Sequence, residues 1–326
     1  METTVEAAIG SADRTGAADG LCVTLVDGTS RQLAGLSQRE LIALQWDQER
    51  DFAVRILAAP KGSLARAEAT RHAYDTVTRV FAAVCQTAGE PLRMGLQPRQ
   101  EQMVVDALRR QQRHGLQPRL LEIGYASGIL LRRVSAAGFS VAGIEVSAQM
   151  RQQALALLGP QFASCLHLGD FLRYEFPRAE GPFTLVYWND VFEHVAPDEI
   201  LDYLTRIHEL LAPGGQLITV TPNWHVRPSD ITRMVRPARS EPEGLHLKEY
   251  TLREVSALLR RAGFVRVATP LVSLPGRIVL CGSGLAGWKR LVEPSLEALP
   301  YRLARLLCRG AGLSTTIATK AGRGIR

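Results

Sequence analysis

The sequence predicts an α/β protein, with a doubly wound and mostly parallel sheet preceded by a mainly helical N-terminal extension. From residue 115 onward, short apolar segments alternate with amphipathic segments of helical period, which is typical of a sheet covered by helices on both faces. Residues 21–114 instead favour helices. A turn of small residues at 124–128, between a strand pattern and a helix pattern, indicates a ligand site. The chain is therefore divided into 1–20, 21–114 and 115–326.

Length and composition restrict the protein class. The 326 residues, 46% hydrophobic and 22% charged, are ordinary for one large or two modest globular domains. The uncharged stretch Ile278–Trp288 has only 11 residues, whereas a membrane helix needs about 20. The N-terminus lacks the basic and then apolar pattern of a secretory signal. A cytoplasmic location is therefore expected.

The charge and the cysteines are distributed unevenly. The net charge is +7, and the excess of positive charge lies in residues 223–326, which carry 18 basic and 7 acidic side chains. This favours an anionic acceptor, a membrane surface or nucleic acid as a partner. The five cysteines are scattered without C-x-x-C spacing. Neither a disulfide framework nor a metal site is predicted.

The N-terminal third is predicted element by element. Residues 1–20 are rich in small and polar residues and are expected to be a disordered leader. Residues 21–26 favour a strand. Ser37 and Glu40 have the spacing of a capping box, which marks a helix start. The expected helices span 37–58, 63–87 and 99–113.

The second part alternates strands and helices. The expected strands are Leu120–Ile123, Ser140–Ile144, Ser164–Leu168, Thr184–Trp188, Gln216–Thr221, Val265–Thr269 and Thr315–Thr319. The helices between them are expected at 129–137, 148–158, 197–211 and 251–262. Residues 275–313 are an insertion between the last two strands. Its segment 296–309 places leucines on one helical face, which either packs on its own domain or lies in a membrane interface.

One strand–helix–strand segment, residues 120–145, carries the strongest functional signal. Its first strand ends near Glu122 and its second at Glu145, and the turn between contains Gly124, Ala126, Ser127 and Gly128. Small residues let the backbone approach a ligand, and a carboxylate at the end of the second strand can accept hydrogen bonds from ribose hydroxyls. The spacing differs from the G-x-G-x-x-G of dinucleotide sites. Because Glu122 suits a cationic amine better than a pyrophosphate, S-adenosylmethionine fits this turn.

Several motifs in the same order resemble the class I S-adenosylmethionine-dependent methyltransferases. They are the turn just described, Gly169-Asp170-Phe171, the segments 185–194 and 211–223, and the segments 246–251 and 258–264. The last two resemble the small-molecule branch, of the type 11 or ubiquinone-biosynthesis kind. The resemblance covers about 115–270 and departs from the family at Ala126, where glycine is usual. It implies a Rossmann-like, seven-stranded sheet with an antiparallel last strand.

The resemblance also implies the site residues. Cofactor contacts are expected from Glu122, Gly124, Ala126, Ser127, Gly128, Glu145, Val146, Gly169, Asp170, Phe171 and Asn189. Glu122 would lie near the methionine amine, Glu145 at the ribose and Asp170 at the adenine amino group. His194 is the favoured catalytic residue, because a neutral imidazole can accept a hydroxyl proton near pH 7. His246 and Asp190 are the further catalytic candidates.

The implied reaction is methyl transfer from S-adenosylmethionine, expected at an oxygen of a small-molecule acceptor that is anionic or lipid-linked. A nucleic-acid methyltransferase is the first alternative, favoured by the basic third but without a recognised RNA-binding module. A catalytically silent protein that keeps the cofactor fold is the second. A nicotinamide oxidoreductase is disfavoured by the glycine spacing. A homodimer and a peripheral membrane contact through 296–309 stay open.

Overall fold

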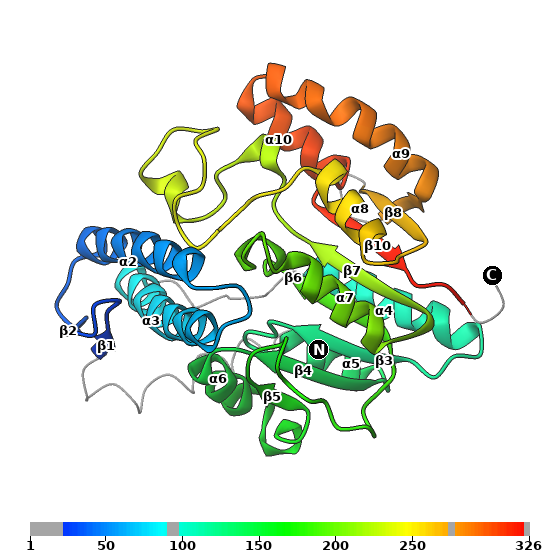
Figure 1. The fold of residues 1–326 in the computed structure, drawn as a ribbon, viewed down its shortest axis with the longest axis horizontal. Helices are drawn as coiled ribbons and strands as arrows, with labels where there is room; N and C mark the ends of the chain where they lie inside the picture. The colour runs from blue at the N-terminus through cyan, green and yellow to red at the C-terminus, as the bar shows by residue number, and fades with distance from the viewer. Residues whose placement is uncertain (1–21, 90–97, 273–277, 323–326) are drawn as a thin grey trace.

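The computed structural model describes residues 22–89, 98–272 and 278–322. A central sheet carries helices on both faces, and a pair of N-terminal helices lies at one end of it (Figure 1). This confirms the predicted fold class. The leader expected over 1–20 lies outside the described residues.

The large sheet has eight strands in the order β5-β4-β3-β6-β7-β10-β8-β9. Their bounds are β3 Arg119–Ile123, β4 Ser140–Glu145, β5 Leu166–Leu168, β6 Phe183–Asn189, β7 Leu211–Val220, β8 Arg266–Val272, β9 Ile278–Gly282 and β10 Thr315–Thr319. Strands β3 to β7 pair in parallel, whereas β10 is antiparallel to both β7 and β8. The seven-stranded arrangement implied by the resemblance is therefore present.

The eighth strand, β9, was not predicted. It lies within the expected insertion and pairs antiparallel with β8, with Thr269 opposite Gly282 and Leu271 opposite Leu280. The sequence pattern placed this apolar stretch in an insertion between the last two strands. Pairing with an otherwise free sheet edge gives these residues the ladder hydrogen bonds that an isolated strand would lack.

Helices cover both faces of the sheet. On one side lie α7 (Ile200–Leu210) and α8 (Leu252–Arg261), and on the other lie α4 (Pro98–Arg113), α5 (Ile129–Ala136) and α6 (Ala148–Leu158). Strand β6 shows how the sequence encodes both layers. Val186 and Trp188 pack toward α7 and α8, whereas Leu185 and Tyr187 pack toward α4 and α5. Because side chains alternate along a strand, a continuous apolar run fills two cores at once.

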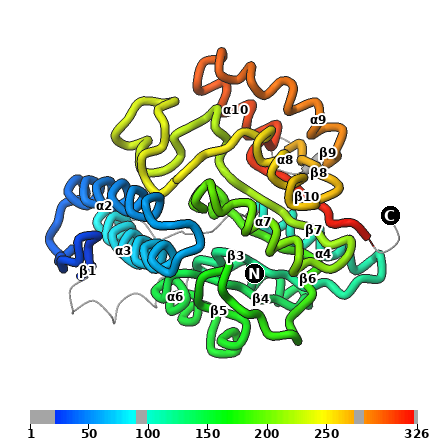
Figure 2. The backbone as a smooth tube through the Cα atoms, in the orientation of Figure 1, coloured from blue at the N-terminus to red at the C-terminus, as the bar shows by residue number. Residues whose placement is uncertain are grey.

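The N-terminal extension consists of a short hairpin and two long helices. The hairpin joins β1 (Cys22–Thr24) to β2 (Ser30–Gln32), and α2 (Gln38–Ala58) packs along α3 (Leu64–Ala88). The predicted capping box at Ser37 and Glu40 is present at the start of α2. Glu49 of α2 accepts a hydrogen bond from the backbone N–H of Leu245 at 3.2 Å. The segment between β7 and α8 therefore runs beside α2 (Figure 2).

The insertion forms β9, α9 (Ser283–Val292), a 3₁₀ segment and α10 (Tyr301–Gly310). The sequence left open which way the leucine face of this region points. Leu299 is partly buried, and Ala304 and Cys308 face the interior. Leu303 and Leu306, by contrast, are exposed. A membrane contact of residues 296–309 stays a prediction, and none of the helices among the described residues is both long and apolar enough to span a bilayer.

Candidate functional site

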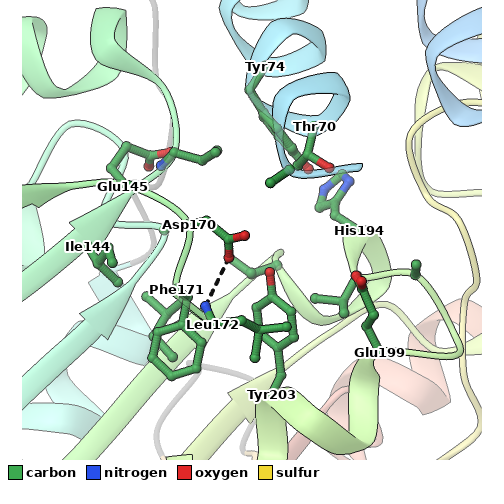
Figure 3. A pocket seen from close by; sticks show the side chains of 18 of the residues that line it. Thr70, Tyr74, Ile144, Glu145, Asp170, Phe171, Leu172, His194, Glu199 and Tyr203 are labelled. Carbon is green, nitrogen blue, oxygen red and sulfur yellow. Dashed lines mark hydrogen bonds between the residues drawn. The ribbon is translucent and has the colours of Figure 1, made fainter. Parts of the chain in front are cut away.

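A cavity of about 620 Å³ lies between α3 and the carboxyl ends of β3, β4, β5 and β6 (Figure 3). Ligands of open α/β sheets bind at this edge. Ten of the residues predicted from the sequence line it: Gly124, Ala126, Glu145, Val146, Gly169, Asp170, Phe171, Asn189, Asp190 and His194. Four others, Glu122, Ser127, Gly128 and His246, do not line this cavity.

The turn after β3 takes a left-handed path that suits small residues. Gly124, Ala126 and Gly128 have φ angles of +70°, +45° and +71°. A Cβ atom at Gly124 would lie 2.5 Å from Cγ2 of Val191. Alanine at position 126, where the family usually has glycine, adopts the positive φ at some cost in strain. The turn therefore brings its backbone N–H groups close to the cavity.

Gly128→Ala is expected to lower the free energy of unfolding by about 2 kcal/mol, from the left-handed backbone together with overpacking. The added Cβ would lie 2.6 Å from Cδ1 of Leu158. Gly138→Ala is the matched control, because Gly138 has a φ of +86° and no atom within 4 Å of the added Cβ. Urea unfolding measures both. Equal losses in the two variants would contradict a steric contribution at Gly128.

Glu145 is held in place by the backbone of the two turns beside it. Its carboxylate accepts hydrogen bonds from the N–H groups of Ala126 at 3.1 Å, Val146 at 2.8 Å and Ser147 at 3.2 Å. Burial raises the pKa of Glu145, and these three donors counteract that rise. A carboxylate has about four acceptor positions. Glu145 therefore has one acceptor position left, on Oε2, for a hydrogen bond from a ligand in the cavity.

Asp170 and Phe171 lie at the same end of the cavity (Figure 3). One carboxylate oxygen of Asp170 accepts the N–H of Leu172 at 2.9 Å, which fixes the side chain at the cavity edge. Phe171 is nearly buried and stacks on Tyr203 at 5.4 Å between ring centroids. Phe171 is therefore both a core residue and part of the cavity wall.

Glu122 lies in a small separate cavity, together with Glu101, Tyr187 and Asn189. Burial and the charge of Glu101 raise the pKa of Glu122 well above its usual range. Among the described residues, neither Oε2 of Glu122 nor Oδ1 of Asn189 has a hydrogen-bond partner. Buried acceptors of this kind usually have one, so a ligand with a cationic amine would fit between the two cavities.

His194 ends the 3₁₀ segment Phe192–His194 that follows β6. Its Nδ1–H donates to the carbonyl oxygen of Leu245 at 2.8 Å, which leaves Nε2 as the acceptor nitrogen. Its ring contacts His246 edge-on at 4.7 Å between centroids and Tyr74 at 5.7 Å. Burial and the charge of His246 lower the pKa of His194 to about 3. His194 therefore faces the cavity as a neutral imidazole.

His246 lies behind His194 rather than in the wall of the cavity. Its Nδ1 donates to Oε1 of Glu249 at 2.9 Å, and its Nε2 is 3.9 Å from Oε1 of Glu193. Burial opposes ionisation of His246, but Glu249 and Glu193 outweigh it and raise the pKa to about 9. His246 can therefore act on the cavity through His194 and Glu193.

Sequence reasoning missed one wall of the cavity. Helix α3 contributes Arg66, Thr70 and Tyr74, and α7 with the turn before it contributes Glu199 and Tyr203 (Figure 3). In the sequence these are ordinary polar positions of amphipathic helices. No local pattern marks them, because the packing of α3 over the sheet edge depends on contacts distant in sequence.

Three arginines in the segment between β7 and α8 form contacts within the protein. Arg227 stacks on Trp224 and pairs with Glu297 at 3.0 Å, and Arg236 pairs with Glu243 at 3.1 Å. Arg239 donates to the carbonyl oxygens of Leu296 and Leu299. Arg227 and Arg239 therefore bind this segment to residues 296–299, whereas the Arg236–Glu243 pair lies within it.

Comparison with known proteins identifies the class. A family model described as a methyltransferase domain matches residues 87–269, more than half of the chain. The chain belongs to this methyltransferase family. The family uses S-adenosylmethionine, so the predicted cofactor and enzyme class are confirmed. The narrower small-molecule branch stays a prediction.

Curated relatives of the methyltransferase are similar over a limited segment. Uncharacterized methyltransferases of Bacillus thuringiensis and Bacillus cereus are 32% identical to it over 99 residues, which is 30% of this chain. The chain spans 44% of the length of these relatives.

Two solved structures show similar folds. Haemonchus contortus phosphoethanolamine N-methyltransferase 2, in complex with S-adenosylmethionine, is 16% identical, with a TM-score of 0.46 over 81% of this methyltransferase and 61% of that chain. A methyltransferase from Archaeoglobus fulgidus is 17% identical, with a TM-score of 0.41 over 68% of this chain and 94% of that chain. At these TM-scores neither neighbour carries an argument about the substrate.

Proposed function

We propose that this methyltransferase transfers a methyl group from S-adenosylmethionine to an oxygen atom of a small-molecule acceptor. The observation that carries the proposal is that one cavity is lined both by residues suited to the cofactor and by residues suited to the acceptor. Glu145 and Asp170 line one part of it, and Asp190 and His194 line another. S-adenosylmethionine, when bound, supplies an electrophilic methyl group on a positively charged sulfur.

The residues at the first part of the cavity fit this cofactor. Glu145 would accept a hydrogen bond from a ribose hydroxyl, and Asp170 would accept one from the adenine amino group. Glu122 and Asn189 have buried oxygens without hydrogen-bond partners among the described residues, which suits a cationic amine nearby. The turn at Gly124 and Ala126 leaves the backbone close to the ligand.

The residues at the second part of the cavity suit an oxygen acceptor. Methyl transfer is an in-line displacement, so the enzyme gains most of its rate by positioning the acceptor. A hydroxyl acceptor must also lose its proton. His194 faces the cavity with Nε2 as an acceptor, because Nδ1 is already bonded to the carbonyl oxygen of Leu245. Because burial keeps its pKa low, His194 would hold the hydroxyl by a hydrogen bond and take the proton as the O–CH₃ bond forms, when the oxygen becomes strongly acidic.

The charges around the cavity favour a neutral acceptor. Four carboxylates line it, from Glu145, Asp170, Asp190 and Glu199. The lining cations are Arg66 and Arg173, and Arg66 already pairs with Asp198 and Glu199. Apolar side chains of Ile56 and Phe81 complete the wall. We therefore favour a hydroxyl-bearing molecule with an apolar portion over the anionic acceptor expected from the sequence.

The test is methyl transfer from isotopically labelled S-adenosylmethionine to matched acceptors. Phenols, hydroxyquinones and sugars are compared with the corresponding amines and with transfer RNA, and products are identified by mass and by the chemical shift of the new methyl group. We expect O-methyl products, and a rate about 10²–10⁴-fold lower for His194→Ala. Methylation confined to the amines or to RNA would overturn the oxygen assignment.

A further inference from the structure

We propose that Glu193, His194 and His246 bind a divalent transition-metal cation at the acceptor end of the cavity. One candidate ligand atom from each of the three residues lies within 4.8 Å of the other two. Two imidazoles and one carboxylate are a ligand set that suits first-row transition metals such as iron, cobalt and zinc. The inference rests on the proposed oxygen acceptor and changes the role of His194 from proton acceptor to metal ligand.

The hydrogen bonds around the cluster support this assignment. Nδ1 of His194 is held by the carbonyl oxygen of Leu245, and Nδ1 of His246 by the carboxylate of Glu249. Metal-binding histidines almost always donate their other N–H to a carbonyl or carboxylate in this way. Both rings are therefore fixed with Nε2 on the side of the ring away from these bonds, and a bound cation would displace the second proton of His246.

Glu193 provides the independent observation. Its side chain is fully buried, and Oε2 accepts a hydrogen bond from Oγ1 of Thr221 at 2.9 Å. Oε1 has no hydrogen-bond partner among the described residues and lies 3.9 Å from Nε2 of His246. A buried carboxylate oxygen without a hydrogen bond is costly. A cation between Oε1 and the two Nε2 atoms would remove that cost.

The dimensions of the cluster suit a cation after a small adjustment. Ligands bound to zinc at about 2.0–2.2 Å lie roughly 3 Å from one another. The candidate ligand atoms lie within 4.8 Å of one another, with 3.9 Å between Oε1 of Glu193 and Nε2 of His246, and side-chain rotation can bring them closer. His194 and Asp190 both line the cavity, so an open coordination position would face the acceptor.

This position gives the cation a role in the reaction. An acceptor hydroxyl oxygen beside a divalent cation loses its proton more readily, and the proton passes to the carboxylate of Asp190 in the cavity wall. An electron pair of the acceptor oxygen then forms the O–CH₃ bond while the CH₃–S bond breaks. The two electrons of the broken CH₃–S bond stay on sulfur, and the product is S-adenosylhomocysteine.

The test is a titration of the chelator-treated full chain with Co²⁺, followed by visible absorption. We expect about one equivalent to bind with the bands of imidazole and carboxylate ligation, and without the charge-transfer band of a thiolate. Glu193→Gln and His246→Ala should remove this binding. Glu249→Gln changes a residue that holds both His246 and Ser229 without being a proposed ligand, and should weaken the binding about 10–100-fold. His114→Ala is the matched control, since His114 is exposed and far outside the cluster.

Calorimetry with S-adenosylhomocysteine on the same proteins separates this inference from the proposed function. Variants that keep S-adenosylhomocysteine binding but lose Co²⁺ support the metal site, because the fold and cofactor site are then intact. Failure of the wild-type chain to bind Co²⁺, or equal Co²⁺ affinity in Glu193→Gln and wild type, would overturn it. Loss of S-adenosylhomocysteine binding by the wild-type chain would instead refute the proposed function.

Discussion

Glu145→Ala is expected to weaken the binding of S-adenosylhomocysteine by about 10–150-fold. Glu145 lines the cavity and is positioned by three backbone donors, from Ala126, Val146 and Ser147. Each hydrogen bond to a charged group contributes about 1.5–3 kcal/mol. Loss of one bond to a ribose hydroxyl therefore costs roughly 1.5–3 kcal/mol, or a factor of about 10–150 in the dissociation constant.

Isothermal titration calorimetry measures this effect. Glu175→Ala is the matched control, because Glu175 is exposed and does not line the cavity. Glu145→Gln keeps an oxygen at the same place and should bind with intermediate affinity. Wild-type affinity in Glu145→Ala, with the fold intact by circular dichroism, would show that the ribose lies elsewhere. NADH serves as a control ligand and is not expected to bind.

The strands and the cofactor turn could be predicted from the sequence because their signals are local. Val186 and Trp188 belong to a continuous apolar run, as expected for a strand buried on both faces. Gly124 and Gly128 mark a turn whose positive φ angles need small residues. Strand order, however, came from the family resemblance. Nothing local in the sequence indicated that β9 would extend the sheet.

The cavity wall formed by α3 and α7 could also not be predicted, and the reason is different. Thr70 and Tyr74 lie on α3, whose sequence is that of an ordinary amphipathic helix. Their position depends on how α3 packs over the sheet edge, which involves partners more than a hundred residues away. In the same way, the sequence located a helix near 296–309 but not its buried face. The small residues Ala304 and Cys308 pack inward, while Leu303 and Leu306 stay exposed.

The cluster around Glu193 illustrates a third limit. His194 and His246 are candidates in the sequence but lie more than fifty residues apart, Glu193 was not singled out, and no recognised metal spacing joins the three. Only the folded chain brings Nε2 of His246 to 3.9 Å from Glu193. Histidines that look like separate catalytic candidates in the sequence therefore become parts of one site in the structure.

Arg66→Ala is expected to lower the free energy of unfolding by about 2–4 kcal/mol. Arg66 is 4% exposed and joins α3 to the start of α7. Its guanidinium forms two bonds with the carboxylate of Asp198, at 2.6 and 3.1 Å, and lies 3.3 Å from Glu199. Removing one partner of a buried ion pair typically costs 3–5 kcal/mol. The half-exposed carboxylate of Asp198 lowers that value, because water can replace part of the contact.

Lys61→Ala is the matched control for Arg66→Ala, because it removes an ion pair between the same two parts of the chain. Lys61 and Asp202 lie 2.7 Å apart, but both side chains are about half exposed, so water replaces most of the contact and the loss should be much smaller than for Arg66→Ala. Urea unfolding gives both values, and hydrogen exchange should show faster exchange in α3 for Arg66→Ala alone. Equal effects of the two substitutions would mean that the apolar faces of α2 and α3, rather than the buried arginine, hold the helical extension over the cavity.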